Sequence, residues 1–368
     1  MVLHIRLAAI SFALTLVTMP AGARAEDLGV IKDKALEEGA LNLAGFSRDR
    51  CSFGTIIDSF VSKNPGIAVT ELMPEATSEE QLARLRTAGE YPGTEIPDVV
   101  QLDYLSGPSA KAEGLLQPYI ANNLNELPLP AYDVEYGDRY WSGAYFYVAA
   151  MLVNTDAVPN PPKDWVDLLK PDFAGQIALP ADPSASPMVA LAVLSAGNAL
   201  AEPGLSAAAR GLDHFAAVAA AGNLAKVAGT PETVADGTTP ILILSDADAL
   251  AAREATAGTA ALKIVIPMRG ATADIHVMAI SAAAPHPNAA KLWFEHFYSY
   301  ISQSELLRGD CNPINWSDLA DWDLLPDDLT EGRPSNLIYT VAQFPTYEQR
   351  AESTALVAGK WDAMVGAP

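Results

Sequence analysis

The feature that most constrains this chain is an almost unbroken apolar run at residues 141–154. It opens with the sequence WSG and continues through aromatic and β-branched residues, which favour an extended backbone. Prolines between 159 and 162 limit its length, and so short an apolar run predicts a strand buried on both faces. We expect this strand to leave one lobe and enter another, with Tyr145 and Tyr147 near the gap between the lobes. The alternative is an ordinary core strand whose aromatics have no ligand role.

The bulk composition fits a large globular protein. The chain has 368 residues, of which 50% are hydrophobic and 18% are charged, so it can bury a large core and form two domains. Its formal net charge of −22 disfavours nucleic acid and anionic membrane surfaces as partners. We therefore expect no nucleic-acid partner.

The first 25 residues have the pattern of a signal peptide. His4 and Arg6 precede an apolar run at 7–17, and Ala23-Arg24-Ala25 has the small-x-small form of a cleavage site. The run is too short to span a bilayer, and no later window is long and apolar enough to do so. We expect cleavage after Ala25, export to the periplasm, and no membrane insertion.

Cysteine occurs at two positions, Cys51 and Cys311. An even count in an oxidising compartment permits one disulfide. It would close a loop of about 260 residues and stabilise the fold by roughly 5 kcal/mol in the chain-entropy model. The alternative is two free thiols that lie far apart.

Strands alternate with amphipathic helices along the chain. For example, Phe53, Ile56, Ile57 and Phe60 fall on one face of a helix, and the stretch 77–80 has the form of a capping box. This alternation predicts an α/β fold with a parallel sheet. Strands are expected at residues 41–46, 67–72, 98–102, 241–244, 262–266 and 274–280.

Loops that follow the expected strands are the candidate ligand site. In parallel α/β sheets ligands bind beyond the C-terminal ends of the strands, where helix N-termini offer free N–H groups. Residues 47–52 and 103–109 are two such loops, and a third at 182–187 leads into another helix.

The stretch Ser245-Asp246-Ala247-Asp248 follows an apolar strand at the same kind of edge. A carboxylate in a partly desolvated cleft would favour a bound cation, because a buried charge needs a partner. On that reading Asp246→Ala should weaken an amine ligand strongly. The alternative for Asp246 and Asp248 is helix capping and a favourable interaction with the helix dipole.

Motifs for catalysis, metals and cofactors are not found in the sequence. No HExxH, Cys/His zinc spacing, phosphate-binding loop or dinucleotide glycine pattern occurs. The closest approach to a nucleophile elbow, Gly107-Pro108-Ser109, lacks the second glycine. We expect no catalytic residue, no metal and no cofactor.

Five stretches in order resemble the periplasmic solute-binding proteins of ABC importers, in the branch with polyamine, ferric-ion and thiamine binders. They are FVSKNPGIAV at 60–69, PDVV at 97–100, EGLLQP at 113–118, the region 165–180 and APHPNAAK at 284–291. The resemblance implies a type II two-lobed fold, with two hinge crossings near 145 and 268–272 and a ligand cleft between the lobes. Lobe 1 would comprise 26–144 and 269–312, and lobe 2 would comprise 145–268 and 313–368.

The resemblance also implies a function. A non-enzymatic, monomeric receptor would capture a small organic solute and deliver it to the membrane permease of the importer. Ferric-ion binders carry adjacent tyrosines where this chain has Ser245-Asp246, so an amine is favoured over iron. The leading ligand is therefore a polyamine or an amino acid with a separated amine.

Alternatives remain open at this point. Arg48 and Arg50 would suit a carboxylate or phosphate, so an organic anion or sugar phosphate held by them and by the helix starts near 107 and 184 is a second reading. An exported hydrolase on a two-lobed scaffold is a third. The candidate ligand contacts are Ser47, Arg48, Tyr104, Tyr145, Tyr147, Ser184, Asp246 and Arg269.

Overall fold

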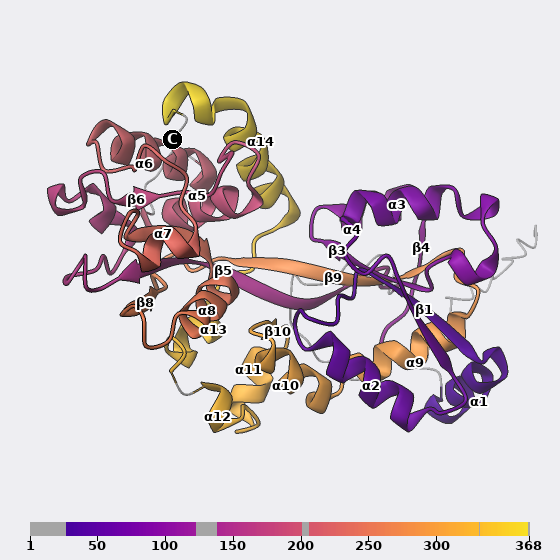
Figure 1. The fold of residues 1–368 in the computed structure, drawn as a ribbon. Helices are drawn as coiled ribbons and strands as arrows, with labels where there is room; N and C mark the ends of the chain where they lie inside the picture. The colour runs from indigo at the N-terminus through magenta and orange to yellow at the C-terminus, as the bar shows by residue number, and fades with distance from the viewer. Residues whose placement is uncertain (1–26, 123–137, 201–205, 331, 367–368) are drawn as a thin grey trace, which may run out of the picture.

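Two α/β lobes joined by two long strands make up the protein (Figure 1). The structure is a computed structural model that describes residues 27–122, 138–200, 206–330 and 332–366. The expected signal peptide at 1–25 lies outside these residues. Within the described ranges, no helix is both long enough and apolar enough to cross a membrane.

Strand β5 (Ser142–Asn154) belongs to both lobes, and all 13 of its residues are buried. Its first half, up to Val148, pairs antiparallel with β9 (Ala273–Ser281). Its second half pairs antiparallel with β7 (Ile241–Ser245) and β8 (Leu262–Val265). The predicted strand, buried on both faces and passing from one lobe to the other, is confirmed.

The sheet runs in the order β2-β1-β3-β9-β5-β7-β6. In the first lobe, β1 (Ala40–Ala44) pairs parallel with β2 (Ala68–Leu72) and β3 (Val99–Asp103). In the second, β6 (Ile177–Ala178) pairs parallel with β7. The prediction of a parallel sheet is wrong at the centre, where β9 is antiparallel to β3 and β5. The reason is that β9 carries the chain back into the first lobe, opposite in direction to β5.

Helices cover both faces of the first-lobe strands. The buried residues of α2 include Phe53, Ile56, Ile57 and Phe60, as the spacing predicts, and the capping box of α3 is present between Thr77 and Glu80. The elements of this lobe are α1 (Leu28–Glu38), α2 (Phe53–Lys63), α3 (Ser78–Arg86), the short 3-10 helices Ala88–Glu90 and Gly93–Glu95, α4 (Ser106–Ala112), β4 (Leu116–Gln117) and α9 (Pro287–Phe297).

The second lobe is built on closely packed helices. A Cβ at Gly197 or at Gly211 would overlap the backbone of the facing helix, so glycine at both positions permits α5 and α6 to touch. The last helix docks on this pair. The elements are the 3-10 helices Trp165–Leu169 and Pro171–Phe173, α5 (Pro187–Leu200), α6 (Ala207–Ala220), α7 (Pro231–Ala235), α8 (Asp246–Ala255) and α14 (Tyr347–Met364).

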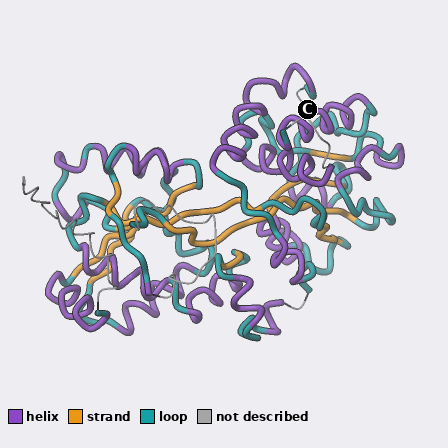
Figure 2. The backbone as a smooth tube through the Cα atoms, turned by 180° about the vertical axis from the view of Figure 1, so that it is seen from behind, coloured by secondary structure: helices purple, strands orange, loops and turns teal. Residues whose placement is uncertain are grey.

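A further segment lies beside the junction of the lobes, as Figures 1 and 2 show from opposite sides. It contains α10 (Tyr300–Arg308), β10 (Asn312–Pro313), α11 (Trp316–Asp321), α12 (Asp327–Thr330) and α13 (Asn336–Val341). Strand β10 pairs with β5 at Phe146 and Tyr145. The lobe boundaries expected at 144/145, 268/269 and 312/313 fall within β5, shortly before β9 and within β10.

Candidate functional site

A pocket of about 540 Å³ lies where the two lobes face each other, and we call it the cleft pocket. The first lobe, the junction strands, the second lobe and helix α14 all contribute to its walls. The residues that line it are Arg50, Asp103, Tyr104, Leu105, Tyr147, Ser186, Pro187, Met188, Ser245, Asp248, Asp274, His276, Arg350 and Thr354.

The loop that carries Arg50 is tied down by a disulfide. Cys51 and Cys311 are bonded, with their Cα atoms 5.1 Å apart, so the loop is joined to the start of β10. Gly309 packs so closely on this loop that a Cβ there would overlap the backbone of Cys51 and Ser52. The first-lobe wall of the cleft pocket is thereby fixed to the segment beside the junction.

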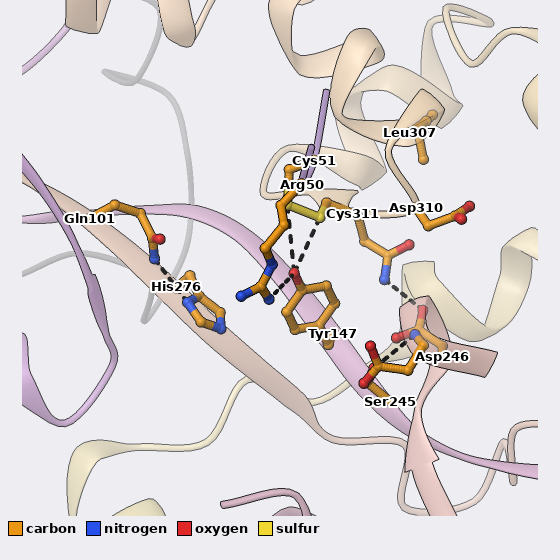
Figure 3. Close-up of a disulfide and its surroundings, with 12 residues drawn as sticks. Arg50, Cys51, Gln101, Tyr147, Ser245, Asp246, His276, Leu307, Asp310 and Cys311 are labelled. Carbon is orange, nitrogen blue, oxygen red and sulfur yellow. Dashed lines mark hydrogen bonds between the residues drawn. A yellow bond between two sulfur atoms is a disulfide. The ribbon is translucent and has the colours of Figure 1, made fainter. Parts of the chain in front are cut away.

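The hydroxyl of Tyr147 completes this wall (Figure 3). It lies 3.5 Å from Cys51 Sγ and 3.2 Å from Cys311 Sγ, and it donates the hydrogen bond because disulfide sulfurs carry no proton. Arg50 Nη2 in turn donates to the Tyr147 oxygen over 3.5 Å. Burial raises the pKa of Tyr147, so its phenol stays protonated.

The two arginines of the loop have different surroundings. Arg48 forms ion pairs with Asp58 at 2.7 Å and with Glu71 at 2.8 Å, and it does not line the cleft pocket. Arg50 does line it, and its guanidinium makes no ion pair with a carboxylate in the described part of the chain. Arg50 is therefore the guanidinium available to a ligand.

An aromatic cluster lies behind the pocket. The ring of Tyr145 stacks on His276 with centroids 4.8 Å apart, and Tyr147 meets the same imidazole edge-on at 5.4 Å. Gln101 Nε2 lies 2.9 Å from His276 Nδ1. Burial lowers the pKa of His276, so the imidazole is neutral near pH 7. Tyr145 is 1% exposed and supports the wall without lining it.

Arg350 brings the C-terminal helix to the site. Its Nε donates to Asp274 Oδ1 at 3.1 Å, and its Nη2 donates to the Pro187 carbonyl at 3.0 Å. These two contacts join α14 to β9 and to the start of α5. The guanidinium of Arg350 is thus already paired with the carboxylate of Asp274. Nothing local in the sequence marks Arg350 as part of a site.

The two aspartates after β7 divide into two roles. Asp246 is fully buried, accepts from the Val148 N–H and from Asn312 Nδ2, each at 2.8 Å, and has a pKa that burial raises to about 6. Asp248 lines the cleft pocket and accepts from Ser245 Oγ at 2.7 Å. The structure thus brings Asp248 to the pocket and places Asp246 at the junction of the strands.

The other residues expected from sequence are dispersed. Tyr104 lines the pocket and packs edge-on against Trp141, and burial raises its pKa to about 12. Ser47 is buried, Ser184 donates to Asp182 at 3.0 Å, and Arg269 donates to the Ala199 carbonyl at 2.7 Å. None of these last three lines the cleft pocket, and ligand contact by them stays a prediction.

Sequence reasoning missed Asp274, His276 and Arg350. In the loop expected at 182–187 it selected Ser184, whereas Ser186 and Pro187 line the pocket. Alternation along β9 could have found Asp274 and His276, since these polar residues share one face of an otherwise apolar strand. In the part of the chain that the structure describes, no group of three or more His, Cys, Asp or Glu residues could hold a metal ion.

Known proteins resemble the chain over most of its length. A family model for bacterial extracellular solute-binding proteins matches residues 94–321. No curated protein matches the sequence. Among solved structures, IdiA (FutA) from Trichodesmium in complex with iron and citrate is 19% identical, with a TM-score of 0.62 over 90% of this chain and 100% of that one.

Two further structures have the same fold. PotD from Streptococcus pneumoniae, a spermidine/putrescine transporter substrate-binding protein, is 13% identical, with a TM-score of 0.61 over 87% of this chain and 99% of that one. AgtB from A. tumefaciens R10, in complex with agropinic acid, is 18% identical, with a TM-score of 0.57 over 89% and 98%. These likenesses confirm the two-lobed type II fold with a cleft between its lobes.

Proposed function

Because the chain belongs to the bacterial extracellular solute-binding proteins, we propose that it captures a small amino-acid-like solute in the cleft pocket for the permease of an ABC importer. The solute carries a carboxylate and an amine separated by a carbon chain. One observation carries this assignment: Arg50, which has no carboxylate partner among the residues that the structure describes, and Asp248 line the same pocket from opposite lobes.

Arg50 supports the carboxylate end. A guanidinium binds a carboxylate through two parallel hydrogen bonds, which makes it selective as well as strong. Tyr104 and Tyr147 line the same pocket, and their aromatic rings suit contact with a carbon chain or an ammonium group. A carboxylate could bind Arg50 here without breaking an ion pair within the described residues.

The charges of the pocket support an amine at the other end. Three carboxylates, Asp103, Asp248 and Asp274, line the pocket with two guanidinium groups, and Arg350 is already paired with Asp274. Closure of the lobes removes water from these groups, so each remaining charge needs a partner from the solute. A solute with zero or positive net charge meets that need, and a polyanion does not.

Delivery to the membrane follows from closure. Hinge bending at the junction strands would bury the solute, and the closed shape would be what the permease recognises. Export through the signal peptide expected at 1–25, and action as a monomer in the periplasm, are parts of the same proposal.

An organic anion or sugar phosphate is the second candidate, and the similar structures with citrate and agropinic acid keep it in view. The guanidinium of Arg50 favours it, because no carboxylate in the described part of the chain pairs with it. However, Arg48 pairs with Asp58 and Glu71, so one arginine of the loop reaches the pocket instead of two. A hydrolase is not favoured, since the family consists of binding proteins.

A thermal-shift screen of the mature chain tests the proposal, because a ligand that binds the native state raises the melting temperature. The panel is 6-aminohexanoate, lysine, putrescine, citrate and glucose 6-phosphate. We expect the two amino acids to bind best. Stabilisation by citrate or the phosphate ester alone would overturn the amino-acid assignment in favour of the anion.

Two neighbouring arginines provide a matched pair for calorimetry with 6-aminohexanoate. Arg50→Gln should weaken binding at least about tenfold, because a lost charged hydrogen bond costs roughly 1.5–3 kcal/mol. Arg48→Gln, which removes exposed ion pairs outside the pocket, should leave the affinity within about twofold. Equal affinities for the two variants would remove Arg50 from the site.

A further inference from the structure

A second cavity adjoins the cleft pocket on the side of the second lobe. It has a volume of about 570 Å³, and Ser186, Met188, Ser245 and Asp248 line both cavities. We call it the side pocket. Because four lining residues are shared, the two cavities lie next to each other, which is the arrangement that one elongated solute would need to occupy both.

The walls of the side pocket are mostly apolar. Leu242 and Leu244 of β7 form one side, and Ala251 and Ala255 of α8 form another. These two alanines are four residues apart and therefore lie on the same face of the helix. Both are exposed, and the small methyl groups leave open a volume that leucine or methionine would fill.

The charges of the side pocket have one sign. Asp248 at its entrance and Glu232, the second residue of α7, are the two charged residues that line it, and no Lys or Arg does so among the described residues. Apolar walls with two carboxylates suit a hydrocarbon chain that ends in an ammonium group. They do not suit a second carboxylate or a phosphate.

We propose that the side pocket binds the carbon chain and terminal amine of the solute while Arg50 in the cleft pocket binds its carboxylate. This inference rests on the proposed function and narrows it to linear amino acids whose two charged ends are separated by several methylenes. Ala251 and Ala255 then set the longest chain that fits, and Glu232 with Asp248 selects an amine at its end.

A homologous series measures the depth of the site. Calorimetry on the mature chain would use 4-aminobutanoate, 6-aminohexanoate and 8-aminooctanoate, with octanoate as the probe that lacks an amine. Affinity should rise by up to about fourfold per buried methylene until the side pocket is full. Octanoate should bind at least about tenfold more weakly than 8-aminooctanoate, because its terminus leaves the carboxylates unpaired.

Filling the side pocket tests its role directly. Ala251→Leu should weaken 8-aminooctanoate at least about tenfold and leave 4-aminobutanoate within about twofold, because the short solute ends near Asp248 in the first turn of α8 and does not reach Ala251. The matched control is Ala217→Leu, at an exposed position of α6 that lines neither cavity. Its affinities should equal those of the unaltered protein.

The outcomes separate the two proposals. If the three amino acids bind with equal affinity, or if Ala251→Leu weakens all of them alike, the side-pocket proposal is overturned and the cleft assignment stands. If none of them binds, both the proposed amino-acid solute and the proposed role of the side pocket are overturned. If Glu232→Gln leaves the preference for 8-aminooctanoate over octanoate unchanged, Glu232 has no part in selecting the amine.

Discussion

The two walls of the cleft pocket are built differently. The first-lobe wall is a charged and aromatic surface fixed by covalent and hydrogen bonds: the disulfide holds the loop of Arg50, and Tyr147 contacts both sulfurs. The second-lobe wall has no disulfide across it: Ser186, Met188, Ser245 and Asp248 line it, and the same four residues also line the side pocket. On the proposed function, the first-lobe wall would hold the carboxylate at a fixed position, and the second-lobe wall would offer Asp248 and adjoining volume to the chain and amine.

Removal of the disulfide should have the largest effect, because it releases the first-lobe wall and so removes the main difference between the two walls. In Cys51→Ser/Cys311→Ser the free energy of unfolding should fall by about 2–5 kcal/mol, since the bridge closes a loop with a sequence separation of 260 residues. Affinity for 6-aminohexanoate should fall too, because Arg50 adjoins Cys51. Scanning calorimetry and titration measure both, and unchanged values would show that packing alone fixes this wall.

A substitution at Asp246 tests whether this carboxylate stabilises the strand junction or contacts the solute. Asp246→Ala leaves the Val148 N–H and Asn312 Nδ2 without their buried acceptor, so the free energy of unfolding should fall by about 3 kcal/mol. Solute affinity should change less than in the Arg50 variant. Denaturant unfolding and calorimetry measure the two quantities. A large loss of affinity at unchanged stability would return Asp246 to the ligand site.

The same carboxyl predicts a pH dependence. Its folded pKa of about 6 is raised from 3.8, so the folded state binds its proton more tightly than the unfolded state does. Its contribution to stability is therefore present in full below about pH 4 and is lost as pH rises to about 6. The stability of Asp246→Asn, measured relative to the unaltered protein, should increase across this range and be flat above it. A flat difference throughout would contradict the raised pKa.

Arg350 tests whether the C-terminal helix shapes the second-lobe wall. Arg350→Met removes a nearly buried ion pair with Asp274 and a hydrogen bond to Pro187, so stability should fall by about 2 kcal/mol. Lys360→Met is the control, because Lys360 is exposed on the same helix. Chemical unfolding of the two variants gives the difference, and equal stabilities would contradict a structural role for Arg350.

Tyr147→Phe should have the smallest effect. It keeps the ring against His276 and removes the hydroxyl that contacts both sulfurs and Arg50, so stability should fall by about 1 kcal/mol or less. The affinity for 6-aminohexanoate should change by less than about threefold. A larger loss in titration would mean that the hydroxyl itself contacts the solute.

Most of the fold was predictable from the sequence because local patterns specify its elements. The expected strand at 98–102 is β3 at Val99–Asp103, and the apolar run at 141–154 is β5. The antiparallel pairing at the centre was not predictable from these patterns. Periodicity identifies a strand, but the direction in which it enters the sheet depends on connections that span the whole chain.

The site was less predictable, and the aspartates show why. Asp246 and Asp248 are two residues apart in the first turn of α8, so their side chains point to different faces of the helix. No local signal says which face meets the cleft. Arg350 lies 76 residues beyond its partner Asp274, and that pairing exists only after α14 docks. Residues that only tertiary packing brings together produce no local sequence pattern from which their contact could be predicted.

The continuity of β5 limits how the molecule can move. One buried strand serves as the spine of both halves, so the lobes cannot slide past each other without breaking its ladder of hydrogen bonds to β9, β7 and β8. Any opening or closure of the cleft would therefore have to bend β5 without interrupting its pairing. A continuous, hydrogen-bonded strand of this kind favours small, reversible changes in the angle between the lobes over the large rotations that a flexible linker would allow.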